Sequence, residues 1–147
     1  MLLAQLVVAQ FAVAPTRADL VRFEELLKAG PPADIETIHT HGPGFYARTI
    51  RMKAGTVLTG KVHATEHIFM VSEGVLTVAT EEGTRTVDAG FQAVCRAGLK
   101  RAGFCHTDVV CTNVHITTET DLVKLEALLI EPEEQGVIAQ GETQCLG

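Results

Sequence analysis

Histidine is the residue type in this chain with the clearest capacity for chemistry. The sequence contains six histidines, which are His39, His41, His63, His67, His106 and His115. His63 and His67 are four residues apart, a spacing that would place both imidazoles on one face of a helix. A glycine precedes this pair and the apolar run 68–71 follows it, which favours two strands joined by a tight bend. Imidazoles that converge from neighbouring strands could begin a metal site, because neutral ring nitrogens bind divalent Fe, Mn, Ni or Zn.

A third ligand could come from the strand pattern over 109–115. Counting in twos places Val109, Cys111, Asn113 and His115 on one face of this strand. His115 is therefore the better third metal ligand, and Asn113 would present a polar group to a bound substrate. His106 precedes the strand in a turn sequence, and it replaces His115 if a bulge shifts the alternation. The pair of histidines could also be a hydrogen-bonded structural pair that holds no metal.

Charged side chains near these histidines could complete a site. Glu66 is either an exposed bend residue or, against an apolar wall, a general acid–base with a raised pKa. Arg101 lies either at the surface or inside, where it would bind the anionic group of a substrate. An inward guanidinium would repel a metal ion unless an anion lay between them. His39 and His41 stand beside a Gly-Pro-Gly sequence and are predicted to be solvated loop residues or lid contacts to substrate.

The elements that must position these residues are mostly short strands. From residue 45 to residue 116, apolar and polar residues alternate in short stretches separated mainly by glycine-containing turns. The predicted strands are 45–52, 56–60, 67–72, 75–80, 84–89, 91–95 and 109–116. This spacing is typical of a β-sandwich or a small barrel. Residues 33–44 are predicted to form a turn-rich connection before the first of these strands.

Two helices are predicted to flank the strands. Thr16 begins a capping-box pattern, an apolar stripe follows, and a Gly-Pro-Pro sequence ends it, which predicts a helix over 16–30. Thr118 begins a second capping-box pattern before a leucine stripe, which predicts a helix over 119–131.

Composition limits the class of protein. A chain of 147 residues is the size of one domain. The net charge of −6 excludes the basic surface that binds nucleic acid. The four cysteines form no CxxC pair, so free thiols in a reducing compartment, the cytoplasm, are expected.

The two ends of the chain differ in character. Residues 1–15 are apolar but lack the basic start of a signal peptide, and glutamines make them too polar to span a membrane. They are predicted to form a strand that packs on a second copy in a homodimer, because a bare apolar edge promotes aggregation. Residues 132–147 form an acidic tail that is expected to be mobile or docked on a partner.

The segment from Gly60 to Gly74 resembles the first motif of the cupin superfamily, which reads His-x-His, three or four residues, Glu, six residues, Gly. Counting six residues back from Gly74 places His67 where the family has its Glu ligand. His63 then matches the second His of the motif, and Lys61 stands where the first would be.

The stretch from Gly90 resembles the second cupin motif in its glycines, but Arg101 stands at the place of that motif's metal-binding His. Lys61 and Arg101 thus hold two of the four usual ligand places. Either the site is rebuilt around His63 and His67 with a further histidine, or the metal has been lost. More narrowly, residues 106–132 resemble small cupin-like proteins of tailed-phage and prophage genomes, which implies a virus-encoded protein in the cytoplasm of a bacterial host.

The cupin resemblance covers about 45–118 and implies a mainly β, single-domain jelly-roll barrel with the two helices at its flanks. Two functions stay open. In the first, the barrel lumen of a small-molecule metalloenzyme, of oxygenase, isomerase or lyase type, holds a metal through His63, His67 and His115. In the second, a non-catalytic binding module or phage accessory protein holds a small ligand or a structural metal. Lys61 and Arg101 favour the second function, whereas the histidines favour the first.

Overall fold

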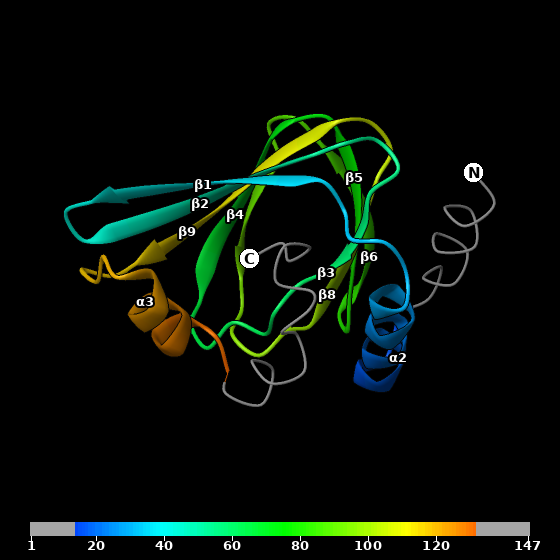
Figure 1. Cartoon of the computed structure of the whole chain (residues 1–147), viewed down its shortest axis with the longest axis horizontal. Helices are drawn as coiled ribbons and strands as arrows, with labels where there is room; N and C mark the ends of the chain where they lie inside the picture. The colour runs from blue at the N-terminus through cyan, green and yellow to red at the C-terminus, as the bar shows by residue number, and fades with distance from the viewer. Residues whose placement is uncertain (1–13, 132–147) are drawn as a thin grey trace.

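The computed structural model describes residues 14–131, which form two antiparallel β-sheets that face each other, with a helix at either flank (Figure 1). One sheet has the strand order β1-β2-β9-β4-β7 and the other the order β3-β8-β5-β6. The strands are β1 (Ile35–Gly42), β2 (Phe45–Met52), β3 (Val57–Thr59), β4 (His67–Glu73), β5 (Val75–Thr80), β6 (Gly83–Asp88), β7 (Gln92–Cys95), β8 (Arg101–Cys105) and β9 (Val109–Ile116). The predicted mainly β jelly-roll with flanking helices is confirmed. The predicted strand within 1–13, with its role in a homodimer, and the predicted tail over 132–147 lie outside the described residues.

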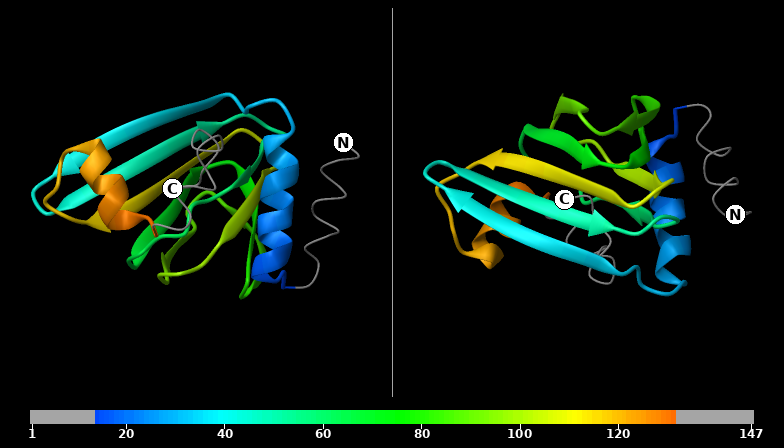
Figure 2. Two further views of the ribbon diagram at one scale, coloured as in Figure 1. Left: turned by 60° about the horizontal axis from the view of Figure 1, so that its bottom comes forward. Right: turned by 90° about the horizontal axis from the view of Figure 1, so that it is seen from above.

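β1 contradicts the predicted turn-rich connection over 33–44. It pairs with the whole of β2, from Ile35 opposite Met52 to Gly42 opposite Phe45. The glycines and proline of this stretch mark only the hairpin turn, where Gly44 has a φ of +85°. The residues before the turn are rich in Ile and Thr, which favour a strand. The resulting hairpin extends the first sheet beyond the second (Figures 1 and 2).

β8 was also absent from the predicted strands, and its burial explains why. All five of its residues are buried, so it lacks the alternation of apolar and polar residues. One face points to the lumen, and the other is covered by helix α2 (Arg17–Lys28), where Leu20 and Phe23 pack against Ala102 and Phe104. Figure 2 shows this helix lying along the outside of the four-stranded sheet.

The two helices begin with different caps. In α2 the hydroxyl of Thr16 accepts a hydrogen bond from the backbone of Asp19, whose carboxylate accepts one in return, so the predicted capping box is confirmed. Helix α3 (Leu122–Leu129) begins later than predicted, because its cap is Asp121, which accepts a 3.0 Å bond from the Lys124 amide, and not Thr118. Neither helix is long and apolar enough to cross a membrane.

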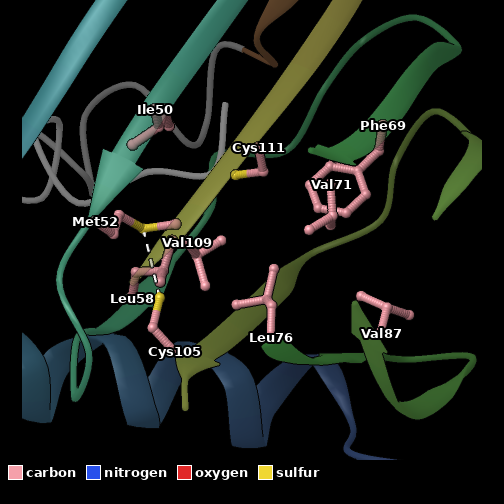
Figure 3. Packing of buried hydrophobic residues seen from close by; sticks show 10 residues of the cluster. All are labelled: Ile50, Met52, Leu58, Phe69, Val71, Leu76, Val87, Cys105, Val109 and Cys111. Carbon is pink, nitrogen blue, oxygen red and sulfur yellow. Dashed lines mark hydrogen bonds between the residues drawn. The ribbon is translucent and has the colours of Figure 1, made fainter. Parts of the chain in front are cut away.

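The hydrophobic core fills one end of the space between the sheets (Figure 3). Its buried members are Ile50, Met52, Leu58, Phe69, Val71, Leu76, Val87, Cys105, Val109 and Cys111. The three cysteines among the described residues are free, two buried and one half-buried.

The inner face of the five-stranded sheet changes from apolar to polar along its strands. Ile50, Cys111 and Val71 form one apolar row across three neighbouring strands. Tyr46 lies four residues before Ile50 on β2, on the same face, and is paired with His115 of β9. The elements that build the core therefore also carry a polar layer beyond it, and we call this layer the polar end of the lumen.

Candidate metal and ligand site

The structure brings His63, His67 and His115 together in the polar end of the lumen. One ring nitrogen from each lies within 4.8 Å of those of the other two, and all three side chains are buried. The ring centroids are 4.2 Å apart for His63 and His67, and about 5 Å apart for the other two pairs. His67 begins β4 and His115 lies near the end of β9, whereas His63 belongs to the irregular segment before β4.

The chemistry of these donors fits a divalent metal ion. Burial, and to a lesser degree the nearby Arg101 charge, lowers the pKa of His67 to about 3 and that of His115 to about 4. Both imidazoles are therefore neutral at pH 7, as a metal ligand must be. The Nδ1 atom of His115 is buried and has no hydrogen-bond partner among the described residues. Three clustered imidazoles form a donor set for Fe, Mn, Ni or Zn.

Arg101 points inward and contacts this group. Its Nη2 lies 3.0 Å from Nε2 of His67 and donates to Oδ1 of Asn113 at 3.4 Å. Its Nη1 lies 3.6 Å from Sγ of Cys95, and its guanidinium lies over the ring of Phe69. Both Arg101 and Asn113 are buried, so the two substrate-binding candidates lie beside the histidines. Because Arg101 donates to Nε2 of His67, this cation and a metal ion would compete for the same lone pair.

Glu66 and His106 lie outside this group. Glu66 is exposed in the bend before β4, where residues 64 to 66 all face solvent. His106 is exposed after β8, where its Nε2 lies 2.6 Å from the hydroxyl of Thr77 and its ring meets Phe104 edge-on. The predicted role of Glu66 in the lumen and the alternative ligand His106 are therefore not supported by the geometry.

A cavity of about 220 Å³ opens beside the histidines and is covered by α3; we call it the α3-covered cavity. Its lining residues are Thr37, His39, Tyr46, Arg48, His63, His115, Leu122, Leu125, Glu126, Leu129 and Ile130. Sequence reasoning missed Tyr46, Arg48 and Glu126. The alternation along 45–52 places Tyr46 and Arg48 on the face that carries Ile50, and this signal could have identified them.

His39 and His41 lie on β1 and not in a loop, which corrects the prediction. Nδ1 of His39 is 2.6 Å from the hydroxyl of Tyr46, and the ring of His41 stacks on the ring of Tyr46 at 5.0 Å. Tyr46 in turn stacks on His115 at 6.2 Å. A continuous stack of rings therefore joins the exposed β1 histidines to the buried group.

Helix α3 is fixed over the cavity by the segment that carries His63. The amide of Ala64 donates to the carbonyl of Leu129 at 2.7 Å. The amide of Glu131 donates to the carbonyl of Val62 at 2.9 Å. The ammonium of Lys61, which is buried, forms an ion pair with Glu126 on the helix. Lys61, at a usual ligand place of the cupin motif, thus serves to attach the cover.

A second cavity, of about 340 Å³, lies on the β6 and β7 side of Arg101. Phe69, Arg85, Phe91, Cys95 and Arg101 are among its lining residues. Because His63 and His115 line the first cavity and Arg101 lines the second, the guanidinium stands between the histidines and this space.

No protein-family model and no curated protein sequence matches this chain. Solved structures do match it. A cupin superfamily protein from Desulfitobacterium hafniense is 4% identical, with a TM-score of 0.51, over 59% of this chain and 81% of its own. An RmlC-like cupin from Shewanella frigidimarina is 14% identical, with a TM-score of 0.50, over 58% of this chain and 78% of its own.

A larger enzyme shares the same fold. One such structure is that of salicylate 1,2-dioxygenase from Pseudoaminobacter salicylatoxidans, determined as adducts with gentisate. Its sequence is 17% identical to this chain, with a TM-score of 0.54 over 77% of this chain. This chain covers 34% of the dioxygenase. At these identities the likeness shows the fold alone, which is the cupin fold that the sequence motifs imply.

Proposed function

We propose that this chain is a metal-dependent small-molecule enzyme of the oxygenase, isomerase or lyase type, with its site in the polar end of the lumen. The observation that carries the proposal is the group of three buried histidines, two of them held neutral by burial. His63, His67 and His115 would hold one Fe, Mn, Ni or Zn ion. When bound, such an ion supplies a Lewis acid that polarises a substrate oxygen.

The other residues of the polar end bind and enclose the substrate. The α3-covered cavity adjoins His63 and His115, and the leucines of α3 line it with apolar side chains. Arg101 and Asn113 would hold a negatively charged group of the substrate on the other side. An anion placed there also removes the repulsion between the guanidinium and the metal ion.

A second function has its own supporting observation. The Arg101 guanidinium lies 3.0 Å from Nε2 of His67, so it occupies a lone pair that the metal would need. In this alternative the chain is a non-catalytic binding module in which Arg101 replaces the metal charge and the cavity holds a small ligand. Fold alone does not separate the two functions, because one scaffold supports many chemistries.

Metal content separates them. The full chain is purified without chelator, its metal is measured by mass spectrometry, and the stripped protein is titrated with Mn²⁺, Fe²⁺, Ni²⁺ and Zn²⁺. We expect about one ion per chain in the unaltered protein. The His115→Ala variant should lose about 10- to 100-fold or more in metal affinity while it stays folded, because the imidazole is a ligand.

His106→Ala is the matched control, since it removes an imidazole that hydrogen-bonds Thr77 away from the group. This variant should bind metal as the unaltered chain does. A folded protein that binds none of the four ions, or a His115→Ala variant that retains full affinity, would overturn the metalloenzyme and favour the binding module.

A further inference from the structure

We propose that Arg48 is the anion-recognition residue of the α3-covered cavity and that the ligand of this cavity is a small carboxylic acid. The inference rests on the proposed function in one respect, which is that this cavity is where the ligand binds. Arg101 lines the second cavity and not this one, so Arg48 is an anion-binding group in addition to the one proposed on the other side of the histidines.

Within residues 14–131, Arg48 is a half-buried cation with no acidic partner. It lines the cavity from β2, and its Nε atom is buried and has no hydrogen-bond partner among the described residues. Its cross-strand neighbours are His39 on β1 and Asn113 on β9, neither of which carries a negative charge. Burying a guanidinium donor without a partner is unfavourable, so a ligand that supplies two acceptor oxygens would complete the site.

The cavity also contains a carboxylate, that of Glu126, on the wall formed by α3. This carboxylate forms an ion pair with the buried ammonium of Lys61. Because Glu126 is engaged in that pair, Arg48 is the group that distinguishes an anionic ligand from a neutral one. The same ion pair attaches α3 to the segment that carries Lys61 and His63.

Size and polarity define the rest of the ligand. The volume of about 220 Å³ is below the roughly 300–1,000 Å³ of sites for drug-sized ligands, so only a small molecule fits. Apart from Glu126, the wall formed by α3 and the residue after it is apolar and consists of Leu122, Leu125, Leu129 and Ile130. The Tyr46 hydroxyl, which lies 2.6 Å from Nδ1 of His39, adds one polar group to the lining. The cavity therefore fits a carboxylate joined to a short apolar group.

The sequence provides an optical probe of this cavity. Tyr46 is the single tyrosine of the chain, and tryptophan is absent, so tyrosine fluorescence reports on the cavity wall alone. The full chain, treated with EDTA, is titrated at pH 7 with isovalerate and with its neutral analogue isovaleramide. The isovalerate concentration that produces half of the fluorescence change should be at least about tenfold lower than the isovaleramide concentration that does so, because only the acid pairs with Arg48. Calorimetry on the same samples detects binding that leaves the fluorescence unchanged.

Two variants assign the preference to Arg48. Arg48→Gln should bind the acid and the amide equally weakly, whereas Arg48→Lys should bind isovalerate severalfold more weakly than the unaltered chain and still prefer it to the amide. Arg51→Gln is the matched control, because Arg51 is exposed on the other face of the same strand. It should leave both affinities unchanged.

Equal binding of acid and amide by the unaltered chain, or no binding of either, overturns the inference. A preference for the acid that survives in Arg48→Gln overturns it as well. If Arg48→Gln does not fold, Arg48→Lys decides, and an unchanged isovalerate affinity in this variant counts against Arg48.

The titration is done without metal, so its result is independent of the metal content. Failure of acid binding with normal metal content overturns this inference alone. A preference for the acid in a chain that binds no metal overturns the metalloenzyme and leaves this inference standing.

Discussion

The two ends of the lumen share strands β2, β4 and β9 and differ in the residues that these strands turn inward. At one end Ile50, Cys111 and Val71 fill the space between the sheets and leave no polar atom to satisfy. At the other end, on the same strands, the inward residues are Tyr46, His115 and others with polar atoms. Burying such atoms lowers stability unless each finds a partner, so a polar layer inside a barrel is expected where ligands bind.

The first way to test this contrast is to damage the apolar end. Leu76 is fully buried in the core cluster, and Leu76→Ala should lower the free energy of unfolding by about 2–5 kcal/mol in urea titrations. Val94→Ala on β7 is the control, because Val94 is 66% exposed and should change stability by about 0.5 kcal/mol or less. A small effect of Leu76→Ala would mean that the apolar end does not supply most of the stability.

The second prediction concerns how much the buried histidines of the polar end lower the free energy of unfolding at acidic pH. In the metal-free protein the pKa values of His67 and His115 are lowered to about 3 and about 4 from 6.5. Between these values and 6.5 the unfolded chain binds more protons than the folded chain, so stability is highest above pH 6.5 and falls as the pH drops towards 4. The expected loss is a few kcal/mol, on the order of one kcal/mol or more for each histidine.

The variant His115→Leu isolates this effect from the titration of carboxylates. It removes one of the two groups, so urea titrations at a series of pH values should show a shallower fall between pH 6.5 and 4. At pH 7 the variant should be as stable as the unaltered chain or more stable, because a buried polar ring is replaced by an apolar side chain. An identical fall with pH in both proteins would show that His115 does not stay neutral in the folded state.

Sequence patterns predicted the inward residues of the polar end better than they predicted the strands around them. Alternation over 109–116 placed Asn113 and His115 on one inward face, and the structure has them there. The strands β1 and β8 were missed, because turn residues near Gly44 masked the first and burial on both faces removed the alternation of the second.

Tertiary contacts decided what the patterns left open. The orientation of Arg101 could not be read from the sequence, because alternation is lost in β8. The roles of Lys61 and Glu126 depend on where α3 packs, which no local pattern encodes. Glu66 is near the histidines in sequence, but it belongs to an exposed bend before β4 and not to the lumen.

The last and smallest predicted effect tests whether Arg101 opposes the metal ion. Arg101→Gln removes both a positive charge and the donor 3.0 Å from Nε2 of His67, so the variant should bind Mn²⁺ or Zn²⁺ about tenfold more tightly in the absence of substrate. The matched control is Arg85→Gln, because Arg85 lines the second cavity above the ring of Phe91 and does not contact the histidines. Weaker metal binding by Arg101→Gln would mean that Arg101 holds His67 in place for the ion. Absence of metal binding in both the variant and the unaltered chain would instead mean that the guanidinium has replaced the ion, so the polar end would bind its ligand through arginine charge alone.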